Sequence, residues 1–270
     1  MVEDSGKRPV EPILTLPDEF REAIAEASKR LGMSFSEVTQ AALHQFLYHD
    51  PKQNAVYLSA PVDALMKGCY EENTTIRELK QHGNFGLGTF NDLDGEMLML
   101  DGTVYQLQDD GFAHPVSDAA ETPFSCVTFF NPTTVEQIEQ DLDYVGFKNL
   151  LDRLMPSENV FSAVRIDGEF SAIRVWSVSR QEAWRPVSEV KPKAFEYQNV
   201  RGTLAGFFTP RFIKSLLHPG YHLHFLTDDR RHGGHLNQCR LQRPTVSLQI
   251  IPRLELNLPI TIDYLTARLV

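Results

Sequence analysis

The chain has 270 residues, 42% of them hydrophobic and 10% aromatic, which is enough for two or three modules with buried cores. Its formal net charge of −10 excludes broad nonspecific attraction to nucleic-acid phosphates or anionic lipid, although a small local contact stays open. No apolar run approaches the roughly 18 residues of a membrane span, and the first residues do not resemble a signal peptide, so we expect a cytoplasmic protein.

Residues 9–50 have the pattern of one strand followed by two helices. A short apolar alternation at Ile13–Leu16 precedes a proline and two acidic residues, which favour a helix start, and apolar residues at helical spacing then continue to Gly32. Ser34, with Glu37 three residues later, predicts a capped second helix. We therefore expect a small separate module over residues 1–50.

This order of elements resembles the ribbon-helix-helix family of small dimeric DNA-binding proteins. The resemblance implies a homodimer whose paired ribbon lays its outward residues in the major groove of DNA. Residues 1–50, however, carry five basic and nine acidic side chains, a net charge of −4, which works against contact with phosphates. A module that binds DNA and a module that only dimerises are therefore both open.

A polar linker at residues 51–55 leads into the main domain, residues 56–270, where short strand-like runs alternate with turn residues. The stretch Thr134–Leu154 has helical periodicity and predicts a helix packed on a sheet. Asp167 and Gly168 predict a hairpin turn. Together these patterns indicate a domain of many short strands with a helix packed on a sheet. The expected strands are Phe85–Phe90, Met97–Leu100, Thr103–Leu107, Cys126–Phe130 and Phe161–Val178.

Three histidines in the C-terminal half of this domain have the spacing of a metal site. His222 and His224 share one face of an extended strand, roughly 6–7 Å apart. The polar run Thr227–Gly234 predicts a turn, and the alternating stretch after it predicts a returning strand that carries His235 beside the pair. Three imidazoles leave a tetrahedral Zn²⁺ one open position, which is the pattern of a catalytic site. Unrelated histidines and another divalent ion remain the alternatives.

Five further motifs stand in a fixed order along residues 55–265. With the histidine segment they resemble the alpha-acetolactate decarboxylase family. The resemblance implies a mixed α/β, largely β-sheet fold and a zinc-dependent carboxy-lyase that converts 2-acetolactate, a 2-hydroxy-3-keto acid, to acetoin and CO2 in acetoin biosynthesis. The motifs are Gly86–Met97, Asp101–Gln106, Thr122–Phe124, Ala163–Gly168 and Val200–Phe207.

The resemblance also implies roles for single residues. It places zinc on His222, His224 and His235, and it makes Thr89 and Glu96 active-site residues. Decarboxylation leaves an enediolate, whose negative charge Zn²⁺ would stabilise as a Lewis acid. Glu96 would then supply a proton, or lie close to the metal as a carboxylate, and Thr89 would hydrogen-bond substrate or water. From the residues alone, a glutamate after an Asp-Gly turn is more commonly solvated.

One position departs from the family pattern. Trp176 stands where the family has an arginine suited to the substrate carboxylate. Arg174 has the same strand parity as Trp176 and is our candidate substrate-binding cation, because a guanidinium can hold a carboxylate in two hydrogen bonds. Trp176 is the second candidate for substrate binding, since it would reshape the pocket for an apolar side group.

Family members also continue past Pro259 into a tail whose glutamate returns to the metal, whereas this chain stops at Val270. Glu255 and Asp263 are candidate substitutes for that glutamate. A second interpretation is a ligand-sensing transcriptional regulator with a catalytically impaired domain. Such a domain would keep the metal site but lack the family's arginine and C-terminal glutamate, and it would be joined to a dimeric module. A zinc enzyme for another 2-hydroxy-3-keto acid is a third interpretation.

Overall fold

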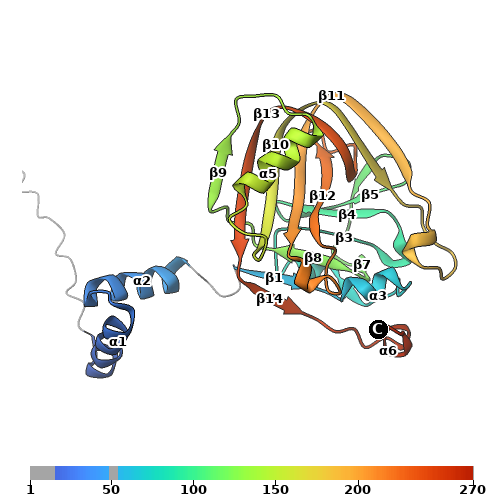
Figure 1. The fold of residues 1–270 in the computed structure, drawn as a ribbon. Coiled ribbons are helices and arrows are strands. Elements are labelled where there is room, and N and C mark those ends of the chain that lie inside the picture. Colours follow the sequence, from blue (N-terminus) through green and yellow to red (C-terminus); the bar gives the residue numbers. More distant parts are fainter. Residues whose placement is uncertain (1–15, 49–53, 270) are drawn as a thin grey trace, which may run out of the picture. The chain divides into compact units, whose positions relative to one another are not determined.

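The computed structural model describes residues 16–48 and 54–269 of the chain, which divides into two compact units, Met1–Asp50 and Pro51–Val270 (Figure 1). The described part of the first unit consists of two helices, α1 (Asp18–Leu31) and α2 (Phe35–Tyr48). The expected strand at Ile13–Leu16 lies outside the described residues except for Leu16, and so do residues 51–53 of the expected linker.

Local chemistry explains the end of α1 and the start of α2. Helix α1 ends at Gly32, whose φ of 66° is the left-handed conformation that glycine adopts without strain. At the start of α2, the Ser34 backbone N–H donates to Glu37 Oε2 at 2.7 Å, and the Glu37 N–H donates to Ser34 Oγ at 3.2 Å. This reciprocal pair is a capping box, and both predicted helices are confirmed.

The second unit is built on two main sheets. The larger sheet has the strand order β14-β1-β8-β3-β4-β5-β6, in which β14 runs parallel to β1 and every other neighbouring pair is antiparallel. Its strands are β1 (Ala55–Leu58), β3 (Phe85–Thr89), β4 (Glu96–Leu100), β5 (Thr103–Leu107), β6 (Ala113–Pro115), β8 (Ser125–Thr128) and β14 (Arg253–Leu256).

The other sheet has the order β10-β11-β12-β13-β9, and β13 also pairs with β10, so that four of its strands form a closed ring. Strand β13 reaches β12 only at its start and follows β10 along most of its length. Closure leaves these four strands with few unpaired backbone groups. The strands are β9 (Thr134–Gln137), β10 (Phe161–Ser177), β11 (Lys193–Thr209), β12 (Gly220–Thr227) and β13 (Gly233–Ile251).

Shorter elements complete the second unit. Helix α5 lies across β13 (Figure 1), and none of the described helices is long and apolar enough to cross a bilayer. The expected β-rich mixed α/β fold is confirmed for this unit. The remaining elements are α3 (Val62–Met66), β2 (Thr74–Thr75), α4 (Ile76–Leu79), η1 (Asn91–Leu93), β7 (Glu121–Thr122), α5 (Tyr144–Leu154), η2 (Val187–Glu189), η3 (Arg211–Ile213) and α6 (Ile262–Thr266).

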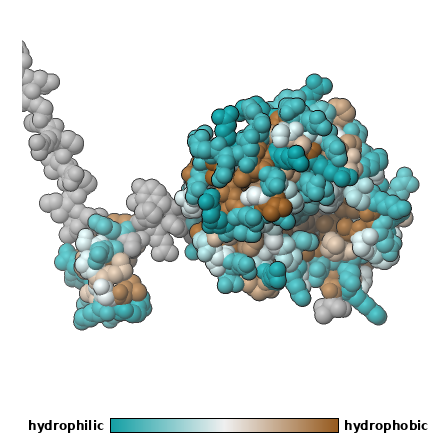
Figure 2. Space-filling view, turned by 45° about the horizontal axis from the view of Figure 1, so that its top comes forward, coloured by the Kyte–Doolittle hydropathy of each residue, from teal (hydrophilic) through white to brown (hydrophobic). Residues whose placement is uncertain are grey.

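The core that matters for the site lies between the two sheets, where β11 packs against β3 and β12 against β4. Phe85 and Phe207 meet there edge to face, with ring centroids 5.9 Å apart. Leu226 of β12 belongs to this core, whereas Phe225 belongs to a second core on the opposite face, which α5 covers. Side chains that share the parity of Leu226 in β12 therefore point toward the larger sheet. The face of the second unit shown in Figure 2 is mostly hydrophilic, with some apolar patches.

The prediction of a helix over Thr134–Leu154 is wrong in its first half. Residues Thr134–Gln137 form the exposed edge strand β9, which pairs with β13, and α5 begins only at Tyr144. The helix starts there because Asp143 Oδ1 accepts a hydrogen bond from the Gly146 N–H at 2.8 Å. The free edge of β13 decided the conformation of the preceding residues, and that edge is not visible in local periodicity.

The predicted hairpin turn at Asp167 and Gly168 is also wrong, because β10 runs through both residues without a break. Neither residue has the positive φ that a two-residue type I′ turn requires. A side chain at Gly168 would lie 3.2 Å from the Pro244 backbone, so this glycine permits close approach of β13 rather than a change of direction.

Candidate metal centre

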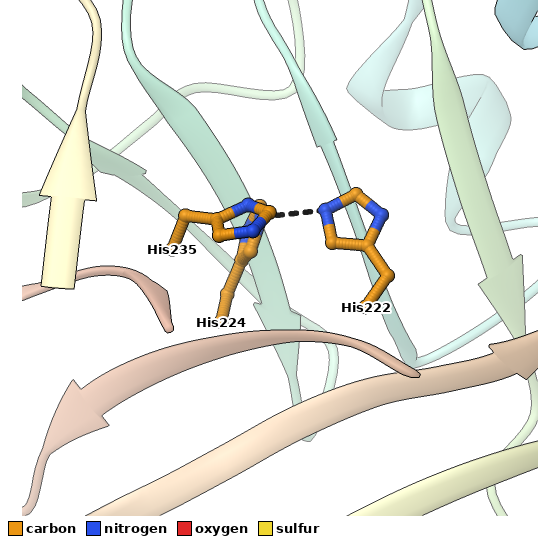
Figure 3. Close-up of side chains that lie close together, drawn as sticks. All are labelled: His222, His224 and His235. Atoms are coloured by element: carbon orange, nitrogen blue, oxygen red, sulfur yellow. Dashed lines mark hydrogen bonds between the residues drawn. The ribbon is translucent and has the colours of Figure 1, made fainter. Parts of the chain in front are cut away.

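The structure brings the three candidate histidines into one cluster between the two sheets (Figure 3). His222 and His224 share a face of β12, and His235, near the start of β13, lies directly opposite His224. One ligand nitrogen from each ring lies within 4.8 Å of the others. That spacing allows the three imidazoles to bind one ion after small side-chain adjustments.

The β12–β13 hairpin that carries His235 back is fixed by its turn residues. The Thr227 N–H donates to the His232 carbonyl at 2.9 Å, and Asp229 Oδ1 accepts from the Thr227 hydroxyl at 2.6 Å and from the Arg231 N–H at 3.1 Å. At Gly233 a side chain would lie 2.4 Å from the Phe225 carbonyl oxygen, so glycine is required for the strands to meet. The predicted turn and returning strand are confirmed.

His224 is oriented by a backbone group of the other sheet. It is completely buried, and its Nδ1 lies 2.8 Å from the Met97 carbonyl oxygen of β4. Because a carbonyl only accepts, Nδ1 carries the proton, and Nε2 keeps its lone pair. That Nε2 atom lies 3.2 Å from Nε2 of His222. The free lone pair therefore points into the cluster, as a metal ligand requires.

The three rings are neutral at physiological pH. Burial lowers the pKa of His224 to about 4. Burial and the neighbouring imidazoles lower the pKa of His222 and of His235 well below the usual value. Nδ1 of His235 is buried and has no hydrogen-bond partner in the described part of the chain. Neutral imidazoles with an unpartnered nitrogen are the donors that divalent transition metals bind.

Glu96 lies beside the histidines rather than in solvent. Its Oε2 is 3.5 Å from His224 Nε2, the residue is only 8% exposed, and burial raises the pKa of its carboxyl to about 8. Thr89 is its partner in the β3–β4 register and donates from its hydroxyl to the Gly95 carbonyl at 2.6 Å. Thr89 thus supports the turn that leads into Glu96.

Trp176, at the end of β10, is the immediate neighbour of one histidine. Its indole stacks on the His235 ring with the centroids 4.0 Å apart and the planes 22° from parallel. This contact, like that between His224 and the Met97 carbonyl, was missed by the sequence analysis. Neither has a signal in the sequence, because each joins segments that are far apart along the chain.

Three other candidates lie elsewhere. Nε of Arg174 is 3.6 Å from Glu196 Oε1, and the hollow of about 470 Å³ that Arg174 lines includes none of the three histidines. The Glu255 carboxylate is 3.6 Å from His82, and Asp263 belongs to α6. Among the described residues, no carboxylate joins the three imidazoles in the candidate metal group.

Comparison with known proteins gives a consistent picture for the second unit. The family model described as alpha-acetolactate decarboxylase matches residues 56–270. An alpha-acetolactate decarboxylase of Methanosarcina mazei is 40% identical over 221 residues, which cover 80% of this chain and 76% of that protein. One of Bacillus subtilis strain 168 is 36% identical over 223 residues, which cover 82% of this chain and 88% of that protein.

The crystal structure of the alpha-acetolactate decarboxylase from Bacillus subtilis strain 168 resembles this fold. The two superpose with a TM-score of 0.77 at 35% identity, over 80% of this chain and 93% of the other. The family-model match, residues 56–270, includes nearly all residues of the two sheets and the three clustered histidines.

Proposed function

Because the chain belongs to the alpha-acetolactate decarboxylase family, its reaction is the decarboxylation of 2-acetolactate, and we propose that a divalent ion on His222, His224 and His235 serves this reaction. The observation that supports the metal is the convergence of three neutral imidazoles, one of them with its tautomer set by a carbonyl. We propose Zn²⁺, which suits three nitrogen ligands and an open fourth position.

The reaction breaks the bond between the carboxylate carbon and its neighbour, releases CO2 and leaves an enediolate that takes up one proton to give acetoin. A bound divalent ion supplies Lewis-acid stabilisation of the developing negative charge. The protein must therefore place a proton donor next to the carbon that loses CO2.

Glu96 is the proposed proton donor. Its carboxyl lies beside His224, and burial, which raises its pKa to about 8, favours the protonated form that a donor needs. Thr89 holds the backbone in front of Glu96, and its oxygen retains lone pairs that accept a hydrogen bond from substrate or water. Of the two expected substrate contacts, Trp176 adjoins the histidines, whereas Arg174 is paired with Glu196 and is left out of the proposed site.

The enzyme proposal is tested with zinc-loaded protein and racemic 2-acetolactate, by following CO2 and acetoin. We expect turnover by the wild type and by His114→Ala, whose ring is half exposed, and none by the double variant His222→Ala/His224→Ala. Equal rates for wild type and double variant would overturn the proposal. No observation on the described residues favours the regulator alternative.

For the first unit we propose a ribbon-helix-helix-like module that forms a homodimer. Among the side chains described there, Val38 is 8% exposed, whereas Phe20 is 54%, Leu31 56% and Phe35 42% exposed. On the face shown in Figure 2, the helical unit carries apolar patches among hydrophilic residues. Two short helices bury too little apolar area to be stable alone, so a second copy of the same apolar faces supports the proposal.

Sedimentation of the full-length chain tests the dimer. Phe20→Asp and Phe35→Asp should produce monomers, whereas Glu26→Gln on the exposed surface of α1 should leave the dimer intact.

Titration of labelled upstream DNA at low salt tests whether the module also binds DNA. We expect no shift, because the net charge of residues 1–50 is −4, from five basic and nine acidic residues.

A further inference from the structure

The three rings of the candidate metal centre are held in different ways. His224 donates through Nδ1 to the Met97 carbonyl, which fixes both its tautomer and its orientation. His235 lacks such a bond, since its buried Nδ1 has no partner among the described residues. The ring that stacks on His235 is the indole of Trp176, at 4.0 Å between centroids and 22° between planes, whereas the His222 and His224 rings lie tilted to it.

We infer that Trp176 is a positioning residue of the metal centre, which holds the His235 imidazole in its ligating orientation by stacking in place of a hydrogen bond. The inference rests on the proposed function of the cluster as a metal site. The terminal torsion of histidine is broad, so a free ring would sample many orientations. A flat indole at van der Waals distance blocks rotation toward one side and favours the parallel arrangement.

The backbone is built to create this stack. Between Arg174, opposite Gln238, and Val175, opposite Leu236, the β10–β13 register shifts by one residue, which leaves Asn237 unpaired. Without that bulge the residue opposite Trp176 would be Leu236, and the histidine would lie one position further along. The bulge therefore sets His235 directly opposite Trp176.

Gly234 brings the two strands close enough for the rings to touch. A side chain at this position would lie 2.8 Å from Val175 Cγ2 and 2.9 Å from the Trp176 carbonyl oxygen. The close approach thus depends on glycine immediately before His235. An indole face also attracts positive charge, so it favours the imidazole more when that ring ligates a cation than when it is free.

The test compares Trp176→Phe, which keeps a flat ring, with Trp176→Leu, which keeps an apolar side chain without one. The full-length, metal-stripped proteins are titrated with Zn²⁺ against a chromogenic chelator and with Co²⁺, whose visible absorption spectrum reports ligand geometry. We expect Trp176→Leu to weaken affinity by about 10–100-fold, as changes around metal ligands commonly do, and to alter the Co²⁺ spectrum. Trp176→Phe should keep most of the affinity and the wild-type spectrum.

Trp184→Leu is the matched control, since it is the other tryptophan of the chain and is 71% exposed. It should bind Zn²⁺ as the wild type does. In Trp184→Phe protein, Trp176 is the remaining indole, and Co²⁺ should quench its fluorescence with the same dissociation constant that the absorption titration gives. This measurement needs no substitution at position 176.

Wild-type Zn²⁺ affinity and an unchanged Co²⁺ spectrum in Trp176→Leu would overturn the inference, as would unquenched Trp176 fluorescence with Co²⁺ bound. The proposed function fails separately, if the zinc-loaded wild type releases no CO2 from 2-acetolactate. If Trp176→Leu loses Zn²⁺ affinity while the wild type does not turn over 2-acetolactate, the positioning role of Trp176 is supported and 2-acetolactate is rejected as the substrate.

Discussion

At the scale of single residues, burial changes what a side chain can do. Glu96 follows an Asp-Gly turn, a position where glutamate is commonly solvated, yet it is 8% exposed and lies 3.5 Å from His224. Desolvation disfavours its charged form and raises the pKa of the carboxyl to about 8. A turn residue has thereby become a buried acid next to a cluster of neutral bases.

Replacing Glu96 by Gln keeps the shape of the side chain and removes its acidic proton. We expect kcat for acetoin formation to fall by about 10²–10⁴-fold, the usual contribution of a positioned general acid. The zinc content should not change, because the three imidazoles remain. Glu136→Gln, on the exposed strand β9, is the control and should retain wild-type kcat. Full activity of Glu96→Gln would show that the proton comes from another group.

At the scale of elements, the hairpin of β12 and β13 depends on close strand contact. Gly234→Ala should lower the melting temperature and weaken Zn²⁺ binding, because the new methyl group would lie 2.8 Å from Val175 and displace His235. The cost of such overpacking is about 1–3 kcal/mol. Thermal unfolding measures the melting temperature, and competition with a chelator measures the Zn²⁺ affinity.

Gly220→Ala is the control that introduces backbone strain without the close contact that a side chain at position 234 would make with Val175. Gly220 has a φ of 86°, but nothing lies within 4 Å of a side chain added there. This variant should lose some stability and keep its metal affinity. If Gly234→Ala bound Zn²⁺ as tightly as Gly220→Ala, close approach of β13 to β10 would not be what positions His235.

The C-terminal segment is attached through a buried carboxylate. The Thr261 hydroxyl donates to Glu72 Oε1 at 2.9 Å, and burial raises the pKa of Glu72 above its ordinary value of 4.5. A carboxyl with a raised folded-state pKa stabilises the fold fully below its unfolded pKa, and this contribution is lost as the pH rises through the folded pKa. The Glu72 carboxyl therefore stabilises the fold less at neutral pH than at acidic pH.

Glu72→Gln should consequently raise the melting temperature at pH 7 and change it little at pH 4, because glutamine still accepts from Thr261 and carries no charge. Thermal unfolding at the two pH values measures the difference. The neighbouring, exposed Glu71→Gln serves as the control and should have no effect at either pH. A Glu72→Gln variant that is less stable at pH 7 would contradict this account.

At the scale of the whole molecule, metal binding and folding of the second unit are linked, because the ligands come from two strands that are assembled only in the folded state. Zn²⁺ at 100 times its dissociation constant should add about 2.7 kcal/mol to the free energy of unfolding. For a unit of this size, that is a rise of about 5–10 °C in melting temperature. Chelator should reverse the rise, and His222→Ala/His224→Ala should show none.

Local features were predictable because their causes lie within a few residues. The capping box of Ser34 and Glu37 and the turn between β12 and β13 each depend on neighbours in the sequence. The wrong predictions concern pairing with distant strands. At Gly168 the sequence predicts a turn, whereas β10 continues through this residue and Pro244 of β13 packs against it.

The sequence by itself determined the family and the three imidazoles, because ordered motifs and the alternation of a strand are properties of contiguous residues. Only the tertiary structure decided how those imidazoles are held and what surrounds them. The Met97 carbonyl on His224, the burial of Glu96 and the indole on His235 all join segments brought together by the packing of two sheets. Which backbone groups meet across that packing is set by register and by a single bulge, and neither is encoded in local spacing.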